Sequence, residues 1–271
     1  MSEQLYQQDP RSGIWFIEAG QGPPLLLLHG NGADAALYVP LLDVLSRHFR
    51  VLIPDLPGFG RSPVSEKWHL PAYMAELERF INRRIRSPYV LMGHSMGGFL
   101  AYQLLIRGRT QTVSRSIWME AAVFRLEAMA ARLLPAYGLF HRLRSHSRER
   151  MEDRLRDWCL NYDAMDLDFK ENFAASFLRS NRQVQAMFMA AAPSMLPYRF
   201  DQLTLPILCL RGAKEQLISR QTDWFAPQLP QGKRVVIPEA GHFLIFENDA
   251  ALQREILDFL LPTHTKKVPL S

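Results

Sequence analysis

Short apolar runs alternate with longer stretches of helical periodicity through the first 120 residues. In chain order they predict strands at 14–20, 23–28 and 51–54, a helix over 72–85, a strand at 89–95, a helix over 96–106, and a strand at 116–120. Strands separated by helices are typical of βαβ units, so this pattern predicts a mostly parallel sheet. The runs 25–28 and 51–53 are apolar at every position, which predicts central strands covered on both faces.

The alternation stops between residues 121 and 203, where helical periodicity rich in Met, Phe, Leu and Ala carries no clear strand. It resumes with PILCLRG at 206–212, a helix near 220–228, KRVVIPEAGH at 233–242 and a last helix over 250–260. We therefore expect an α/β core domain formed by 1–120 and 204–271, with 121–203 inserted as a helical cap.

The length of the chain is typical of an enzyme domain, and its composition predicts no membrane-spanning segment. The 271 residues are 48% hydrophobic with a mean hydropathy of -0.12, and no segment approaches the roughly 18 apolar residues that a span requires. The first residues show neither a basic nor an apolar leader segment, so we expect a cytoplasmic protein. The two cysteines, Cys159 and Cys209, are far apart, which predicts reduced core residues and no cysteine metal site.

The net charge of +5 raises the possibility of an anionic partner such as a nucleic acid. However, the densest arginine cluster, over 141–157, interleaves its six arginines with four acidic residues, partly at i,i+3 and i,i+4 spacing. That pairing favours a solvated helix face. We therefore expect no nucleic-acid partner, and we leave the oligomeric state open.

The chemistry centres on GHSMG at 93–97, which follows an apolar strand and opens a helix. A strand that reverses into a helix within one residue strains that residue and requires small neighbours two positions away on each side. Gly93 and Gly97 meet that requirement, and the turn would lift the Ser95 hydroxyl above the sheet edge. Ser95 is thus the candidate nucleophile.

A nucleophilic serine needs a base and an oriented acid from later strands. His242 follows the last strand, VVIP, and is the candidate base. Two acids follow strands: Glu215 after PILCL, which we prefer because the chain order Ser, acid, His is common in this topology, and Glu120 after SIW. The backbone N–H groups of Asn31 and Met96 are the candidate oxyanion donors. The Asn31 amide would either add a contact or cap the next helix, and Asp55 with Arg61 would fix a structural loop.

These motifs resemble the α/β-hydrolase superfamily over nearly the whole chain: HGNG at 29–32, DLPGFGRS at 55–62, GHSMGG at 93–98, GAKEQL at 212–217 and AGHF at 240–243. The resemblance implies an eight-stranded, mostly parallel sheet with a helical cap after the sixth strand. It also implies Ser95 as nucleophile, His242 as base, Glu215 as acid, and Asn31 and Met96 at the oxyanion hole. Most members have Asp where this chain has Glu215.

The segment WMEAA also resembles haloalkane dehalogenases, which place a catalytic Glu after the sixth strand. Those enzymes use Asp as nucleophile, followed by Trp, whereas this chain has Ser95 and Met96, which argues against halide chemistry and epoxide opening. Some members that open acyl-homoserine lactones pair HGN with a Glu acid, as this chain does, so a lactonase stays among the alternatives.

The expected activity is that of a serine hydrolase of the carboxylesterase type, cleaving a small apolar ester through a Ser95 acyl-enzyme without metal or cofactor. The alternatives are a lactonase, thioesterase, C–C bond hydrolase or lyase with the same triad, and a ligand-binding protein that does not turn over. The cap would roof an apolar substrate pocket. Its candidate lining residues are Phe124, Phe188, Met189 and Phe243.

Overall fold

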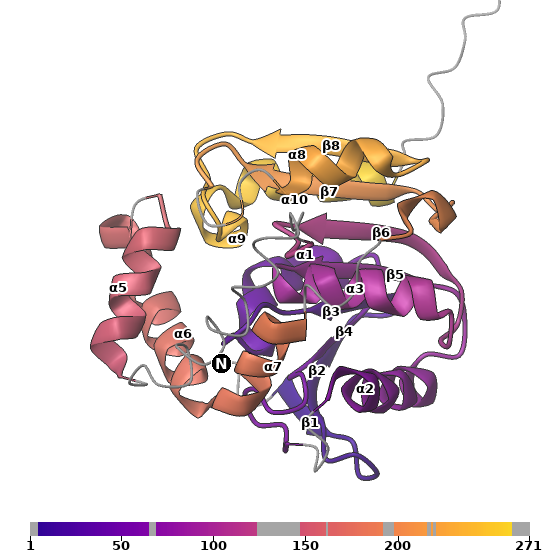
Figure 1. Cartoon of the computed structure of the whole chain (residues 1–271), viewed down its shortest axis with the longest axis horizontal. Helices are drawn as coiled ribbons and strands as arrows, with labels where there is room; N and C mark the ends of the chain where they lie inside the picture. Colours follow the sequence, from indigo (N-terminus) through magenta and orange to yellow (C-terminus); the bar gives the residue numbers. More distant parts are fainter. Residues whose placement is uncertain are drawn as a thin grey trace, which may run out of the picture.

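A computed structural model describes residues 5–64, 69–123, 147–160, 162–191, 198–215, 218 and 221–261. Eight strands form one sheet in the order β1-β2-β4-β3-β5-β6-β7-β8 (Figure 1). β1 and β2 are antiparallel to their neighbours, and β4 through β8 run parallel with β3, which confirms the expected mostly parallel sheet. The strands are β1 Tyr6–Gln8, β2 Trp15–Ala19, β3 Pro24–Leu28, β4 Arg50–Pro54, β5 Tyr89–His94, β6 Val113–Met119, β7 Ile207–Gly212 and β8 Gly232–Ile237.

The central strands are buried on both faces, as their unbroken apolar sequences predict. β3 lies between β4 and β5 and is buried at every position. Its side chains alternate between two cores, with Leu25 and Leu27 in one and Leu26 and Leu28 in the other. Side chains alternate between the two faces of a strand, and in β3 both faces pack against apolar layers, so neither face is exposed to solvent.

Helices cover both of these layers. The layer that contains Leu25 is closed by α1 (Val39–Ser46) and α10 (Asp249–Leu260), and the layer that contains Leu26 by α2 (Leu70–Arg84), α3 (Met96–Arg107) and α8 (Gln221–Phe225) with η6 (Ala226–Gln228). The predicted helices over 72–85, 96–106, 220–228 and 250–260 correspond to α2, α3, α8 with η6, and α10. Neither α1 nor the three-residue edge strand β1 was predicted from the sequence.

Helices fill the described part of the connection between β6 and β7. They are α5 (Arg148–Trp158), η3 (Tyr162–Ala164), α6 (Leu167–Arg179), α7 (Arg182–Ala191) and η5 (Phe200–Gln202), and no strand occurs among its described residues. Figure 1 shows α5 and α6 beyond one end of the sheet. This placement fits the expected cap, whose bounds at 121 and 203 stay a prediction.

The arginines of α5 pair with nearby acids, as their spacing predicts. Arg148 donates to Glu152 one turn along the helix at 2.9 Å and also pairs with Glu171 of α6. Arg156 donates to Asp163 at 2.8 Å. These side chains are exposed, so each pair contributes little to stability.

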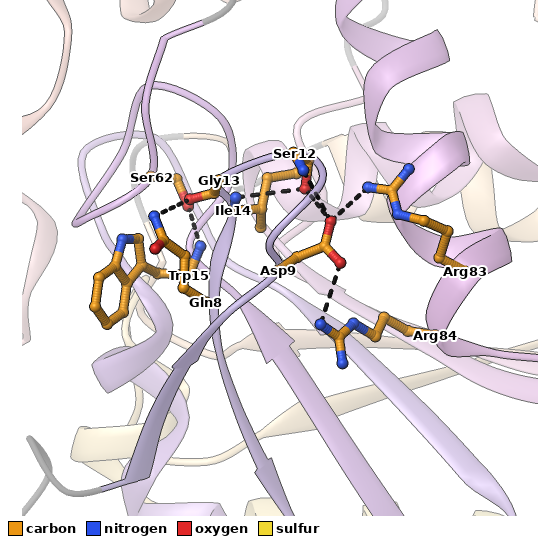
Figure 2. A network of polar contacts seen from close by, with 9 residues as sticks. All are labelled: Gln8, Asp9, Ser12, Gly13, Ile14, Trp15, Ser62, Arg83 and Arg84. Carbon is orange, nitrogen blue, oxygen red and sulfur yellow. Dashed lines mark hydrogen bonds and ion pairs between the residues drawn. The ribbon is translucent and has the colours of Figure 1, made fainter.

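A buried aspartate ties the antiparallel edge of the sheet to α2. Figure 2 shows Asp9, directly after β1, between Ser12 and the last-turn arginines Arg83 and Arg84. The guanidinium groups donate to the two carboxylate oxygens at 2.6 and 3.1 Å, and the backbone N–H of Ser12 donates at 3.0 Å. Burial alone would raise the pKa of Asp9, but the hydrogen bonds from Ser12 and Arg83 outweigh it and lower the pKa to about 2.

Cys159 and Cys209 are both buried and form no disulfide, as expected for core residues. Burial raises the pKa of both thiols well above the ordinary value, so both are protonated at neutral pH. Among the described helices, none has the length and apolar character needed to cross a membrane.

Candidate active site

The candidate residues gather where the parallel strands end. Ser95 follows β5, Glu120 follows β6, Glu215 lies three residues after β7, and His242 lies in the loop after β8. Asn31 lies in the loop after β3. Because the carboxyl ends of parallel strands share one edge, segments far apart in the sequence meet there.

Ser95 occupies a strained turn between β5 and α3. Its φ of 53° is a left-handed value that residues other than glycine rarely adopt. The backbone on both sides is fixed, since the Ser95 N–H donates to the carbonyl of Met119 at 2.9 Å. Its own carbonyl accepts from Gly98 and Ala122 at 3.0 and 2.9 Å. Such over-determined strain is typical of a nucleophile held at a sharp strand-to-helix turn.

The glycines around Ser95 are required by close backbone contacts. A Cβ atom on Gly93 would lie 2.2 Å from the carbonyl oxygen of Gly97, and one on Gly97 would lie 1.9 Å from that of Leu28. Both distances are far below van der Waals contact, and both neighbours are backbone atoms. The steric reason inferred from the sequence for these two glycines is therefore confirmed.

His242 and Glu215 form a hydrogen-bonded pair. The Nδ1 atom of His242 lies 3.3 Å from Oε1 of Glu215, and both side chains are buried. Both carboxylate oxygens of Glu215 also accept from the backbone N–H of Ile218, at 2.8 and 2.9 Å. The backbone N–H of His242 donates to the carbonyl of Trp158 at the end of α5. The pair is thus oriented by its own loop and by the helical segment.

Glu120 reaches the same pair from β6. Its side chain is fully buried, its φ is 42°, and Oε1 accepts from the N–H of Gly212. The second oxygen, Oε2, is buried and has no hydrogen-bond partner among the described residues. Burial first, and then the neighbouring charge of Glu215, raise the pKa of Glu120 well above its ordinary value. The structure therefore brings both candidate acids to His242 and gives the hydrogen bond to Glu215.

One described group has ligand atoms close enough together to hold a metal ion, namely Glu120, Glu215 and His242, whose atoms lie within 4.8 Å of one another. A metal ion there would bind the imidazole nitrogen that faces Glu215 and would replace its hydrogen bond to that residue. This geometry equally suits two carboxyl groups and an imidazole that share protons, and we interpret it so.

His94 holds the main chain of His242. Its Nε2 lies 2.8 Å from the carbonyl oxygen of His242, and the two rings are 4.9 Å apart between centroids. Since a carbonyl only accepts, Nε2 carries the proton. The other nitrogen, Nδ1, is buried without a partner among the described residues. Burial, and then the proximity of His242, lower the pKa of His94 to about 3, so the ring is neutral at neutral pH.

The loop after β3 lies directly against Ser95. A Cβ on Gly30 would be 3.3 Å from the Cβ of Ser95, so the backbone of this loop passes beside the candidate nucleophile. His29 fixes the loop, because its Nδ1 donates to the carbonyl of Gly30 at 2.8 Å and its Nε2 accepts from the N–H of Leu56 at 2.9 Å. Burial lowers the pKa of His29 to about 4, which keeps this donor and acceptor arrangement at neutral pH.

The two candidate oxyanion residues lie in segments adjacent to Ser95: Met96 follows it in the chain, and Asn31 follows Gly30 in the loop beside it. Met96 is the first residue of α3, where N–H groups have no acceptor within the helix. The Asn31 side chain does not cap the following helix, since Asp34 is the N-cap of η2 (Ala35–Tyr38) and accepts from Ala36 at 3.0 Å. The amide oxygen of Asn31 is buried without a partner among the described residues. Of the two alternatives for this amide, capping is thus excluded.

Asp55 is a loop-fixing residue, as its sequence context predicts. Its carboxylate accepts from the backbone N–H groups of Ala35 and Arg61, both at 2.8 Å. The Arg61 guanidinium lies over the ring of Tyr6 at 4.3 Å. Burial and the nearby charge of Asp34 raise the pKa of Asp55 to about 7.

The candidate pocket residues differ in their surroundings. Phe243 is buried next to His242 and packs edge-on against Phe169 and Phe173 of α6, with centroids 5.4 and 5.1 Å apart. Phe188 of α7 packs edge-on against Tyr73 at 4.9 Å. Phe124 and the side chain of Met189 lie outside the described residues. The assignment of these four residues to a substrate pocket stays a prediction.

A cavity of about 570 Å³ lies between α6 and the segment formed by η2 and α1. Phe169 and Phe173 line it together with Phe246, Leu37 and Asp34. The aromatic pairs of these two α6 residues with Phe243 connect the cavity wall to the loop that carries His242. Two rings of the cavity wall thus pack against the residue that follows the candidate base.

Known proteins share this sequence pattern and this architecture. The sequence model of the alpha/beta hydrolase family matches residues 25–254. The magnesium-chelatase 30 kDa subunit of Rhodobacter capsulatus is 34% identical over 125 residues, which are 45% of this chain and 43% of that protein. The pimeloyl-(acyl-carrier protein) methyl ester esterase of Aeromonas salmonicida is 37% identical over 89 residues, 32% of this chain and 34% of that protein. The matches thus span less than half of either relative.

Solved structures align over almost the whole chain. A thermophilic esterase from Thermogutta terrifontis, with malate bound, has a TM-score of 0.76 and 26% identity and covers 96% of this chain and 98% of its own. An enol-lactonase from Burkholderia xenovorans has a TM-score of 0.79 and 18% identity, with coverages of 94% and 99%. At the latter identity the likeness shows the fold alone.

Proposed function

This chain belongs to the alpha/beta hydrolase family, and we propose that it is a serine hydrolase that cleaves a small carboxylic ester of an apolar substrate. One observation carries the proposal above all. The buried His242–Glu215 pair, with Nδ1 3.3 Å from Oε1, shares the sheet edge with a strained serine at a strand-to-helix turn. A nucleophile, a base and an orienting acid are the groups that acyl transfer requires.

In the first step His242 acts as general base. Glu215 engages Nδ1, which leaves Nε2 as the nitrogen that accepts the proton of the Ser95 hydroxyl. The Ser95 oxygen attacks the ester carbonyl, and the negative charge of Glu215 stabilises the imidazolium that forms. The tetrahedral intermediate places its oxyanion toward the N–H groups of Asn31 and Met96.

In the second step the same groups act in reverse. The imidazolium donates its proton to the leaving alcohol, and the acyl group stays on Ser95. His242 then takes a proton from water, which attacks the acyl-enzyme. The second tetrahedral intermediate collapses to the free acid as its bond to the Ser95 oxygen breaks and His242 returns the proton to that oxygen. Every proton in the cycle passes through one imidazole, which agrees with the rigid hold on His242 from Glu215, His94 and Trp158.

An apolar substrate is supported by the surroundings of the base. Phe243 follows His242 directly and packs against two phenylalanines of α6. These rings leave the site with an apolar wall on the side of the helical segment. The partial match to a methyl ester esterase and the 26% identity to a structurally similar esterase agree with ester cleavage. Action in the cytoplasm stays a prediction.

Hydrolysis of chromogenic acyl esters of increasing chain length tests the proposal. The wild type should turn over the esters with a maximum at one chain length, and Ser95→Ala should reduce turnover to the background rate. An unchanged rate in Ser95→Ala would overturn the assignment of the nucleophile. Turnover of lactones, thioesters or C–C bonded substrates without turnover of esters would replace the ester by one of these bonds.

A further inference from the structure

We propose that Glu120 is a protonated positioning residue beneath the triad, which shares one negative charge with Glu215 and takes over as acid when Glu215 is removed. This inference deepens the proposed function and rests on it for its kinetic consequences. The protonation of the Glu120 carboxyl group at neutral pH does not depend on which substrate the protein cleaves.

The geometry brings two carboxyl groups to one imidazole. One oxygen of each of the two carboxyl groups and one ring nitrogen of His242 all lie within 4.8 Å of one another, and all three residues are buried. Two negative charges at this separation in a buried site repel each other strongly, so one carboxyl group keeps its proton. The imidazole provides at most one compensating positive charge, and only when it is protonated.

The hydrogen bonds decide which carboxyl group is neutral. Glu215 accepts from the N–H of Ile218 at both oxygens and pairs with His242 Nδ1, so both of its oxygens are occupied as acceptors. Glu120 has one such donor, the N–H of Gly212, at Oε1. Its Oε2 is the atom without a partner among the described residues, which is where a proton fits.

The other charged groups around Glu120 do not change which of the two carboxyl groups holds the proton. Arg211 of β7 favours the ionised form, but it is also engaged by Asp223 at 3.4 Å. Glu247 of α9 (Leu244–Glu247) disfavours the ionised form, and its carboxylate accepts from Gly241 and Phe243 on the loop of His242. Burial is the largest contribution and raises the pKa of Glu120.

Glu120 also holds the backbone from which Glu215 projects. Its carboxyl group binds the N–H of Gly212, and the carbonyl of Gly212 accepts from the N–H of Glu215 at 3.4 Å. The side chain therefore positions the acid loop while it stays neutral. Glutamine reproduces both the shape and the neutral charge of a protonated glutamate, which makes Glu120→Gln a close mimic of the proposed state.

The first arm of the test compares pH profiles of kcat for the wild type, Glu120→Gln, Glu215→Gln and the double variant. Glu120→Gln should lose much less activity than Glu215→Gln, because glutamine keeps the neutral charge and the acceptor for the Gly212 N–H. The double variant should lose about 10⁴-fold, as for a triad deprived of its acid. Glu215→Gln should lose less and recover activity as the pH rises, because Glu120 then ionises and replaces the missing charge.

The kinetic outcomes that contradict the proposal are equally definite. A loss in Glu120→Gln as large as that in Glu215→Gln would make Glu120 the ionised acid. Identical pH profiles for Glu215→Gln and the double variant would exclude the reserve role. A merely structural Glu120 would give Glu215→Gln and the double variant pH profiles of the same shape, since an additional alkaline rise in Glu215→Gln requires the titration of Glu120.

The second arm is infrared difference spectroscopy, which requires no turnover. The wild type minus Glu120→Gln should contain the carbonyl-stretch band of a protonated carboxylic acid at neutral pH. Glu171→Gln, which changes an exposed glutamate paired with Arg148, is the matched control and should show none. Absence of the band would overturn the inference even if esters are cleaved, whereas its presence without any turnover would overturn only the proposed function.

Discussion

The ring of His94 holds the backbone of His242, with Nε2 2.8 Å from the carbonyl oxygen. This contact links the last residue of β5, next to the candidate nucleophile, to the loop that carries the candidate base, 148 residues later in the chain. It sets the separation between serine and imidazole through the backbone. His94 is therefore a positioning residue that acts through His242.

Replacing His94 should lower kcat and leave KM nearly unchanged. His94→Leu removes one hydrogen bond, worth about 1 kcal/mol, and should reduce kcat about fivefold to tenfold. His94→Gln, whose amide can donate to the same carbonyl, should recover most of that loss. Equal losses in the two variants, measured by steady-state kinetics, would show that packing and not the hydrogen bond is what matters.

The same residue makes stability depend on pH. Because the pKa of His94 falls from 6.5 to about 3 on folding, the unfolded chain binds a proton between these values while the folded protein does not. The free energy of unfolding should thus decrease as the pH falls from about 6.5 toward 3. His94→Gln should flatten this decrease in urea titrations, and an unchanged slope would contradict a buried neutral ring.

Gly97→Ala should be far more damaging than an alanine at the end of the same helix. The new methyl group would lie 1.9 Å from the carbonyl oxygen of Leu28 and 2.9 Å from that of His29, neither of which can move without shifting β3. We expect a loss of at least about 3 kcal/mol in the free energy of unfolding. Denaturant unfolding measures this loss.

Gly108→Ala is the matched control for that substitution. Gly108 ends α3 with a φ of 57°, and no atom beyond its adjoining residues lies within 4 Å of the position that an added methyl group would take, so the left-handed backbone is the main cost to stability. We expect about 1 kcal/mol. Similar losses at Gly97 and Gly108 would contradict the close approach of α3 to β3.

Much of the architecture follows from sequence periodicity because its strands are buried on both faces. The runs that became β3 and β4 have no polar position between their first and last apolar residues, and helices on both sides are what such runs require. β1 was missed for the opposite reason. Its three residues, Tyr6–Gln8, are mostly exposed and pair at the antiparallel edge, so no apolar pattern marks them.

The sequence allowed the candidate site residues to be predicted wherever the end of a strand could be located. Ser95, His242, Glu215 and Glu120 were each placed by the strand before them, and the structure brings these strand ends to one edge. Contacts between backbone and side chain were not predictable in this way. The bond from His94 to the His242 carbonyl, and the capping of η2 by Asp34 instead of Asn31, depend on ring and loop orientations that periodicity does not encode.

Asp9→Asn should destabilise the protein at neutral pH and have little effect in strong acid. The pKa of Asp9 is lowered on folding from 3.8 to about 2, so its contribution is complete above the unfolded value and is lost as the pH falls toward 2. The shift corresponds to about 2 kcal/mol in the free energy of unfolding at pH 7.

Asp43→Asn serves as the control, because Asp43 forms an exposed pair with Arg47 and should change stability by less than about 0.5 kcal/mol. Urea unfolding of both variants at several pH values provides the comparison. A loss in Asp9→Asn that persists at pH 2, or one no larger than that of Asp43→Asn, would contradict the role of the Asp9 network.

The central claim is that Ser95 forms a covalent acyl intermediate, and labelling with an activated phosphonate ester tests it most directly. Intact-protein mass spectrometry should show one phosphonyl group per chain, peptide mapping should place it on Ser95, and ester turnover should fall in proportion to labelling. Ser95→Ala and His242→Ala should take up no label at the same concentration. A label on another residue, or full ester turnover by a completely labelled protein, would contradict the account.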